Sequence, residues 1–463
     1  MIEDRTRRLL DVRLARDQAT ERLPSVAAGL ARDGELVWTD GRGRAEGRTP
    51  DANTQYRAGS ITKTFVAVTV LRLRDAGQLS LPDPLGDHLA LTEIGGSAEI
   101  ARMTIGQLLS HSGGLRAETA GPWWERTPGT SLPDLAASSL GHEAVRFRGG
   151  RRFHYSNVGF ALLGAMVAGK QGRPWHEVVA DEILAPLHMT RTTTRPQRPY
   201  ARGYAVHPYA DVLLAEPEHD AEAMGPAGQL WTTVTDLASF ARFLAGDDAG
   251  IISPDTLAEM REPIAISDAT GQGWTQAYGL GLELWNSSSG VHYYGHTGSM
   301  PGFMAMLQIT DAPGADTVLM VCNSTTGFSP SLSSDLLKVL AEQEPYLPAE
   351  WQPTPVEPEL LELLGSWFWG PAPHTLRLSG ADLELNRAGN DGYGLRFRRD
   401  DGQGWRGIDG YMAGEPLKVI AGPDGRAKAL DVGSFIYTRT PYDPDADVPG
   451  GVEPAGWHAP AQA

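Results

Sequence analysis

A proline-rich segment divides this chain into two parts whose sequence patterns differ. Five prolines fall within fourteen residues, at positions 345, 348, 353, 355 and 358. Such a composition is typical of a stiff, extended linker. We therefore expect residues 345–358 to connect two domains, and a length of 463 residues is consistent with at least two.

The first part, residues 1–344, has strand patterns near both ends and helical patterns between them. A strand-like run covers residues 35–39, and strand patterns return within 278–323. Residues 104–245 are mainly helical in pattern, and the apolar segment 60–77 is long enough for a buried helix. This order predicts one large α/β unit with a helical insertion.

The second part has a different pattern, built from short alternating runs. Leu376-Arg377-Leu378 is one of them, and Gly, Asp and Asn turns separate it from the next. This pattern predicts a small antiparallel β-barrel over residues 359–440. Its opening, Gly365-Ser366-Trp367, resembles that of lipocalin-like barrels. We expect the final residues, 441–463, to be disordered.

Composition excludes several classes of function. Forty basic against fifty-seven acidic residues give a net charge of −17, which argues against a nucleic-acid partner. The single cysteine, Cys322, allows no internal disulfide and no Cys-based zinc cluster. No cluster of His, Asp and Glu has the spacing of metal ligands either, and we expect no metal or cofactor. The charged start, residues 1–8, has no apolar signal region, and no apolar stretch approaches the roughly 18 residues of a membrane span. We expect a cytoplasmic protein without a membrane partner.

The position of one lysine points to chemistry. Only five of the forty basic residues are lysines, and Lys63 lies inside the apolar segment, three residues after Ser60. Residues i and i+3 of a helix lie on the same face, one turn apart. Burying an ammonium without a partner is costly, so a lysine there is rarely only structural. Burial also lowers the pKa of the amine, so that it can accept the proton of a nearby hydroxyl. The pair therefore predicts a serine nucleophile with a lysine base.

Two more motifs follow in order along the chain. The three motifs are Ser60-Ile61-Thr62-Lys63, Tyr155-Ser156-Asn157 and His296-Thr297-Gly298. Together they resemble the motifs of the serine β-lactamase and penicillin-binding-protein superfamily, specifically its class C-like branch. The resemblance covers about residues 15–342. It implies a class C β-lactamase-like sheet flanked by helices, with an all-helical subdomain.

The resemblance also implies a role for each matching residue. Ser60 would be acylated, and Lys63 and Tyr155 would share the proton transfers. Asn157 would orient Lys63 and the substrate amide. The backbone N–H groups of Ser60 and Ser299 would form the oxyanion hole.

The third motif departs from the penicillin-recognising pattern. Those relatives carry a lysine where this chain has His296, and a neutral imidazole is a poorer anchor for a carboxylate. The departure favours an esterase, amidase or acyltransferase. Thr297, Gly298 and Trp231 are expected to contact the substrate. Arg439, at the end of the last barrel strand, is a candidate for a substrate carboxylate, with a surface charge as the alternative reading.

Within the superfamily the chain resembles the penicillin-binding-protein-type thioesterases of non-ribosomal peptide assembly lines. The likeness lies in the nucleophile, Lys, Tyr and His set, the single barrel, the absence of a leader, and the arginine-rich composition. It implies a peptidyl thioester substrate on a carrier protein, released as a macrocycle, with a D-residue at the acyl end. The alternatives are a D-stereospecific peptidase or esterase, a β-lactamase-like hydrolase that releases a linear acid, and a non-enzymatic sensor.

Two other features have open interpretations. Four arginines form a basic island just before Tyr155, at positions 146, 148, 151 and 152. They are suited to a phosphate or an acidic partner, and a solvated surface is the simpler reading. For His111, in the loop 111–114, we expect a structural role.

Overall fold

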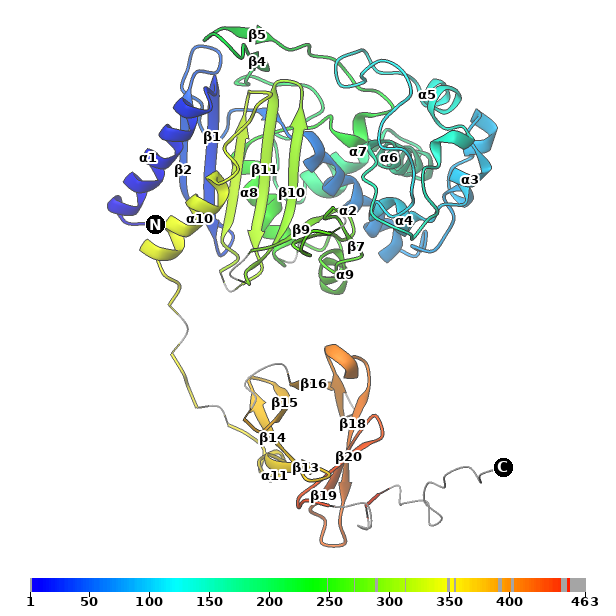
Figure 1. Cartoon of the computed structure of the whole chain (residues 1–463), viewed down its shortest axis with the longest axis vertical. Helices are drawn as coiled ribbons and strands as arrows, with labels where there is room; N and C mark the ends of the chain where they lie inside the picture. The colour runs from blue at the N-terminus through cyan, green and yellow to red at the C-terminus, as the bar shows by residue number, and fades with distance from the viewer. Residues whose placement is uncertain are drawn as a thin grey trace. The chain divides into compact units, whose positions relative to one another are not determined.

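The computed structural model describes residues 2–449 except 248, 270, 288–289, 313, 348–349, 354, 390–393, 401–403 and 443–447. The chain divides into two compact units, residues 1–347 and 348–463 (Figure 1). Most of the tail that we expected to be disordered, 441–463, lies outside the described residues.

The centre of the first unit is an eight-stranded antiparallel sheet with the order β2-β1-β12-β11-β10-β9-β8-β7. Its strands are β1 (Ser25–Arg32), β2 (Glu35–Gly43), β7 (Ala265–Ile266), β8 (Gln276–Tyr278), β9 (Glu283–Asn286), β10 (His292–Met300), β11 (Phe303–Thr310) and β12 (Thr317–Cys322). The first strands of the chain pair with the last, because β1 lies beside β12. The two ends of the unit are thereby joined.

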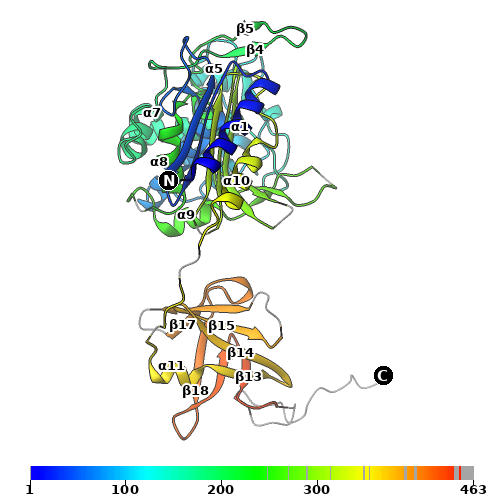
Figure 2. The same cartoon turned by 90° about the vertical axis from the view of Figure 1, so that its left-hand side faces the viewer.

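Helices cover both faces of this sheet. Helices α1 (Asp4–Thr20) and α10 (Leu332–Gln343) lie together on one face, as Figure 2 shows. Alternate residues of β1, such as Val26 and Ala28, pack beneath them. The opposite face packs against α8 (Val234–Leu244) and α2 (Thr62–Asp75). Because both faces are covered, every residue of β12 is buried.

The remaining helices and two small sheets complete the first unit, and most of the helices lie in the insertion. They comprise α3 (Ala98–Ala101), α4 (Ile105–Leu109), α5 (Leu132–Ser139), α6 (Asn157–Gln171), α7 (Trp175–Val179), α9 (Pro254–Met260), β3 (Tyr56–Arg57), β4 (Tyr204–Val206), β5 (Leu213–Ala215) and β6 (Trp231–Thr232). The predicted sheet with a helical insertion is confirmed. The segment 104–245 is less helical than predicted, because it contains strands of only two or three residues, which are too short to leave a local periodicity.

The second unit is a closed antiparallel barrel that follows a short helix, α11 (Pro358–Leu363). Its strands are β13 (Gly365–Trp369), β14 (Ala372–Ser379), β15 (Asp382–Arg387), β16 (Leu395–Asp400), β17 (Gly404–Gly407), β18 (Pro416–Ala421), β19 (Ala427–Val432) and β20 (Phe435–Thr438). Trp367 and Phe397 are fully buried in its core. The predicted lipocalin-like barrel is confirmed.

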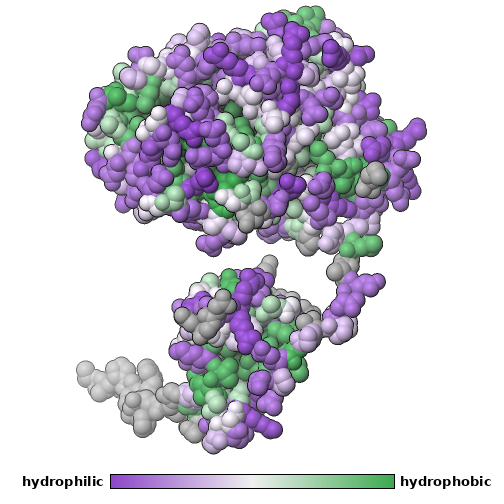
Figure 3. Space-filling model, turned by 180° about the vertical axis from the view of Figure 1, so that it is seen from behind, coloured by the Kyte–Doolittle hydropathy of each residue, from purple (hydrophilic) through white to green (hydrophobic). Residues whose placement is uncertain are grey.

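The surface agrees with the acidic, polar composition. Seen from behind, most of the exposed residues are hydrophilic, with smaller apolar patches between them (Figure 3). Among the described residues, no helix combines the length and the apolar character that crossing a membrane requires. In the same part of the chain, no three His, Cys, Asp or Glu side chains are grouped to hold a metal ion.

Candidate active site

Two glycines bring the predicted nucleophile against the central sheet. Ser60 lies in a single 3-10 turn, Gly59–Ile61, which runs directly into α2. Gly59 has φ +55°, and a Cβ there would lie 2.5 Å from the backbone nitrogen of Ser299. A Cβ on Gly298 would lie 1.9 Å from the carbonyl oxygen of Ala58. Only glycine permits this approach, which places the predicted oxyanion-hole residues Ser60 and Ser299 on adjoining segments.

Lys63 lies directly beneath the nucleophile. Its Nζ donates hydrogen bonds to Ser60 Oγ at 2.9 Å and to the carbonyl oxygen of Ala227 at 2.6 Å. The side chain is fully buried, whereas Ser60 is only half-buried. Burial lowers the pKa of Lys63 from its ordinary 10.5 to about 7. A substantial neutral fraction is then present near pH 7, and only the neutral amine can accept the Ser60 proton.

Nearby carboxylates limit this fall in the pKa of Lys63. The negative charges of Glu118, Glu125 and Glu283 all act to raise it. Burial outweighs them, because removing an ammonium from water costs more than these screened attractions return. Lys63 therefore lies in a negative field without a direct carboxylate partner among the described residues.

Tyr155 comes to the same place from the segment that leads into α6. Its ring centre is 5.0 Å from Lys63 Nζ, and its phenol is close enough to Ser60 for that hydroxyl to act on the pKa of Tyr155. Burial and the nearby carboxylates raise the pKa of Tyr155 well above 10. The phenol is therefore protonated at neutral pH, and it can donate a proton rather than remove one. The segment is anchored by Ser156, whose Oγ accepts a hydrogen bond from Gly159 N at 2.9 Å.

His296 is held on both sides by protein groups. It is fully buried on β10, where its Nε2 lies 3.0 Å from the Tyr278 hydroxyl. Its Nδ1 lies 2.5 Å from the carbonyl oxygen of Thr297 and 3.4 Å from Glu283 Oε1. A carbonyl only accepts, so Nδ1 carries the proton and Nε2 accepts from Tyr278. Burial lowers the pKa of His296, so the ring is neutral at pH 7 and orients Tyr278.

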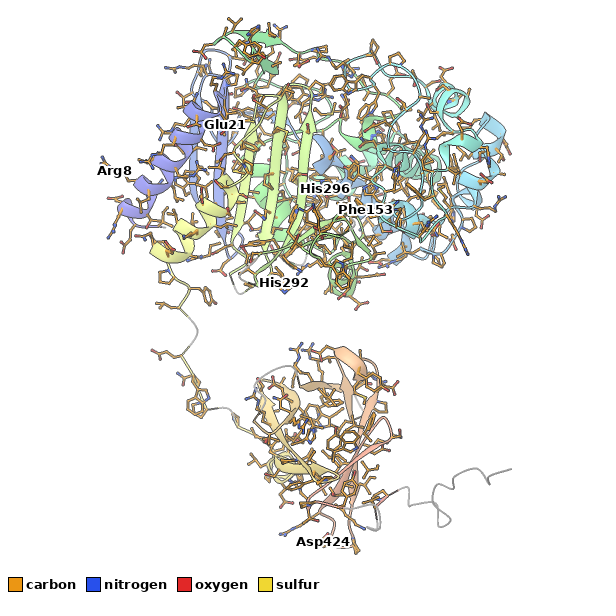
Figure 4. All side chains as sticks on the ribbon, viewed as in Figure 1. Arg8, Glu21, Phe153, His292, His296 and Asp424 are labelled. Carbon is orange, nitrogen blue, oxygen red and sulfur yellow. The ribbon has the colours of Figure 1, made fainter. Side chains whose placement is uncertain are left out.

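The four predicted side chains therefore lie together. Lys63 contacts both Ser60 and the Tyr155 ring, and the rings of Tyr155 and His296 are 6.5 Å apart. Figure 4 shows His296 on the central sheet at the side that faces the helical insertion.

Asn157 does not contact Lys63, contrary to our expectation. Its Nδ2 donates to Glu118 Oε1 at 2.7 Å, and the other oxygen of Glu118 accepts from Trp124 Nε1 at 2.7 Å. Asn157 is the first residue of α6, and its side chain turns toward the loop that carries Glu118. Lys63 is oriented instead by the carbonyl of Ala227.

Thr297 has its own partner within the protein. Its hydroxyl donates to Glu283 Oε1 at 2.9 Å, and its backbone nitrogen donates to Glu283 Oε2 at 3.2 Å. Gly298 is needed for the close approach of the Ala58 carbonyl. Ser299 is exposed on the strand. The predicted substrate contacts of Thr297 and Gly298 remain predictions.

Two predicted substrate contacts are wrong. Trp231 is only 2% exposed and packs edge-on against Phe303 and Tyr200, so it has no surface left for a substrate. Arg439 lies in the barrel, where its guanidinium donates to backbone carbonyls, including those of Leu364 and Ser366. The same group lies 3.8 Å from the centre of the Trp367 ring. Arg439 therefore ties the start of the barrel to its last strand.

Sequence reasoning missed the supporting roles of Tyr278 and Glu283, and it expected a structural role for His111 without placing that residue beside Tyr155. The ring of His111 lies 4.1 Å from that of Tyr155, and its Nδ1 accepts from Ser156 N at 3.1 Å. Its φ of +54° is uncommon for a residue with a side chain. The loop signature around His111 and the run Tyr278-Gly279-Leu280-Gly281 were visible signals. Nothing in the sequence singles out Glu283.

Comparisons with known proteins cover both units. A family model described as Beta-lactamase matches residues 10–333, and one described as Domain of unknown function (DUF7586) matches residues 356–439. Penicillin-binding protein 4 of Amycolatopsis lactamdurans is 26% identical over 356 residues, covering 74% of this chain and 91% of that protein.

Solved structures agree with the family match. A D-stereospecific amidohydrolase from Streptomyces sp. has a TM-score of 0.58 and 25% identity, covering 73% of this chain and 97% of its own. SurE has a TM-score of 0.58 and 23% identity, covering 94% of this chain and 98% of its own. The likeness to SurE shows a shared fold.

Proposed function

Since the chain belongs to the beta-lactamase family, we propose that Ser60 accepts the acyl group of a peptidyl thioester and that the product is a macrocyclic peptide. One observation carries the acyl-transfer chemistry. Ser60 Oγ is hydrogen-bonded at 2.9 Å to Lys63, whose pKa burial lowers to about 7.

The first step is acylation of Ser60. Neutral Lys63 takes the hydroxyl proton while Oγ bonds to the thioester carbonyl carbon. The negative charge on the carbonyl oxygen would be stabilised by the backbone N–H groups of Ser60 and Ser299. When the C–S bond breaks, the departing thiolate receives a proton from the Tyr155 phenol, which Lys63 reprotonates with the proton taken from Ser60, and the ester of Ser60 remains.

The second step returns Ser60 to its free form. The N-terminal amine of the same peptide attacks the ester carbonyl, an amide bond forms, and the bond to Ser60 Oγ breaks. The proton lost by the amine passes through Lys63 and Tyr155 to Ser60 Oγ. A tethered amine has a high effective concentration, which is how it would compete with water.

Charge around the site supports an amine rather than an anion as the second reactant. Glu118, Glu125 and Glu283 all act electrostatically on Lys63. The same field attracts a substrate ammonium and repels a carboxylate. His296 is neutral and its nitrogens are engaged, so it offers no fixed positive charge to the carboxylate of a penicillin-like substrate.

Two finer parts of the proposal concern the substrate. A D-residue at the acyl end is supported by the D-stereospecificity of the Streptomyces relative. Delivery by a carrier protein of a peptide synthetase would make that protein the partner of this chain, and a cytoplasmic location would follow from that partnership.

A second candidate is a D-stereospecific hydrolase that releases a linear acid. It is favoured by the half-buried position of Ser60, which leaves the nucleophile accessible to water. In this candidate water replaces the peptide amine in the second step, and the other residues keep their roles.

Product mass distinguishes the two functions. The full chain would be incubated with one linear peptide thioester, made with either a D- or an L-residue at its acyl end. The macrocycle is lighter than the linear acid by one water. The proposal expects the cyclic product from the D-substrate and none with Ser60→Ala. Linear acid as the sole product from both substrates would establish the hydrolase instead.

A further inference from the structure

An arginine patch lies on the loop that leads into Tyr155. It consists of Arg146, Arg148, Arg151 and Arg152, and all four residues are exposed. Within the described part of the chain, no carboxylate lies within ion-pair distance of any of them. Uncompensated arginines repel one another, so a patch of this kind in a chain of net charge −17 is suited to an anion.

The arginine patch is held in place by backbone hydrogen bonds to the His111 loop. Arg146 N donates to the carbonyl of Gly114 at 2.8 Å, and Gly150 N donates to that of Ser112 at 2.8 Å. His154 N donates to the carbonyl of His111 at 2.8 Å. The arginine backbone is therefore fixed relative to Tyr155, which the side chain of His111 contacts.

A pocket of about 690 Å³ lies between this loop and the edge strand β7. Arg151, Arg152 and Phe153 line it on one side, and Ile264 and Ile266 line it on the other. Both isoleucines are nearly half exposed. The pocket thus combines guanidinium groups with an aliphatic wall.

One carboxylate also lines this pocket, that of Asp268. It accepts hydrogen bonds from Thr275 N at 2.8 Å, Thr275 Oγ1 at 2.9 Å and Gln276 N at 2.8 Å. Asp268 keeps its negative charge, but these bonds hold it on its own loop, and it pairs with neither Arg151 nor Arg152, which remain available to a ligand.

Phe153 connects the pocket with the candidate active site. Its ring centre lies 5.8 Å from that of Tyr278 and 6.5 Å from that of Tyr155. Figure 4 shows Phe153 beside His296, whereas Arg8 lies across the sheet on α1. A ligand in the pocket would therefore lie between the arginine patch and Phe153, whose ring neighbours the catalytic tyrosine.

We propose that the arginine patch binds the phosphate group of a phosphorylated thiol, the leaving group of the thioester substrate. Guanidinium groups bind phosphate oxygens through paired, charge-assisted hydrogen bonds, and an aliphatic arm would lie along Ile264 and Ile266. The proposal rests on the proposed function, because it takes the acyl group to arrive as a thioester. The phosphate on the leaving group would distinguish this substrate from a simple ester or amide.

Binding of the free thiols tests the proposal without any turnover. Dissociation constants of the full chain would be measured by calorimetry for phosphopantetheine, pantetheine and inorganic phosphate. We expect phosphopantetheine to bind at least about tenfold more tightly than pantetheine, and this advantage to fall with added salt. The double variant R151Q/R152Q should lose the advantage, whereas R5Q/R8Q, on exposed arginines of α1, should keep it.

Three results would overturn the proposal. Equal affinities of the wild-type chain for the two thiols would remove the phosphate contact. Inorganic phosphate binding as tightly as phosphopantetheine would reduce the patch to a general anion site. If R5Q/R8Q also lost the preference for phosphopantetheine over pantetheine, that preference would come from the overall charge of the protein.

A kinetic comparison separates this proposal from the proposed function. The same peptide would be presented as its pantetheine and its phosphopantetheine thioester. We expect R151Q/R152Q to raise KM for the phosphorylated substrate by about tenfold and to leave its kcat unchanged. Both kinetic constants for the unphosphorylated substrate should also be unchanged. Preferential phosphopantetheine binding without acylation by either thioester would support the arginine patch while contradicting the proposed function.

Discussion

Lys63 Nζ lies 2.9 Å from Ser60 Oγ, and no carboxylate among the described residues neutralises it by direct contact. Burial instead lowers its pKa to about 7, so that a substantial fraction of the amine is neutral near pH 7. This low pKa reduces the stability of the folded chain, because Lys63 binds a proton more tightly in the unfolded chain than in the folded one.

The first prediction follows from this cost. The Lys63→Met variant should be inactive yet more stable than the wild type, on the order of 2–4 kcal/mol at pH 7, after allowing for two lost hydrogen bonds. The gain should be largest below pH 7 and should shrink as the pH rises toward 10.5, where the unfolded lysine also loses its proton. Urea unfolding of both proteins at several pH values measures this difference in the free energy of unfolding. If Lys63→Met were less stable than the wild type at pH 6, the assigned pKa would be contradicted.

The second prediction concerns the phenol of Tyr155. Tyr155→Phe removes the hydroxyl that lies next to Ser60 and would protonate the leaving group, and kcat should fall by about 10²–10⁴. The pKa of this phenol is well above 10, so the rise of activity near pH 7 should persist in the variant. Steady-state rates from pH 5 to pH 9 check both points. Disappearance of the rise near pH 7 would make Tyr155, rather than Lys63, the titrating base.

The carboxylates around Lys63 provide the third prediction. Glu118 is the largest of the influences that raise the pKa of Lys63. Glu118→Gln should therefore lower that pKa, and the rise of activity should move to lower pH. Glu21→Gln, on a carboxylate at the end of the first helix and away from the site, is the matched control (Figure 4). A shift to higher pH in Glu118→Gln, or an equal shift in both variants, would contradict the proposed electrostatics.

The barrel provides the fourth prediction. Arg439→Gln removes donors to the backbone carbonyls and the contact with the Trp367 ring, so the barrel should lose about 1–3 kcal/mol of stability. The KM for substrate should be unchanged, because these contacts employ the guanidinium within the barrel. Thermal unfolding of the full chain and steady-state kinetics measure the two effects. A raised KM with unchanged stability would restore Arg439 as a substrate contact.

The sequence predicted the parts that depend on local pattern or on ordered motifs. The proline segment separated the two units, and the alternating runs predicted the barrel. The spacing of Ser60 and Lys63 predicted a contact within one helical turn, which the structure has at 2.9 Å. The order of the three motifs predicted that Tyr155 and His296 would lie close to Ser60 and Lys63.

What could not be predicted depends on contacts between distant segments. Asn157 was assigned to Lys63 by resemblance, but the partner it has is Glu118, 39 residues away. Trp231, which we expected to contact the substrate, is buried and packs against Phe303 and Tyr200. These contacts between distant segments are not visible in any local sequence pattern. The Nε2 atom of His296 is hydrogen-bonded to the Tyr278 hydroxyl, and nothing in the sequence indicates this partner.

The rate of acylation of Ser60 as a function of pH is the most direct measurement of the central claim, that neutral Lys63 activates this serine. Single-turnover mixing of the full chain with a peptidyl thioester, followed by intact-mass detection of the acyl-enzyme, gives that rate without the second step. We predict a rise with pH that is half complete at about pH 7, and no adduct with Ser60→Ala. Acylation that is independent of pH from about 5 to 9, or an undiminished rate in Lys63→Met, would contradict it.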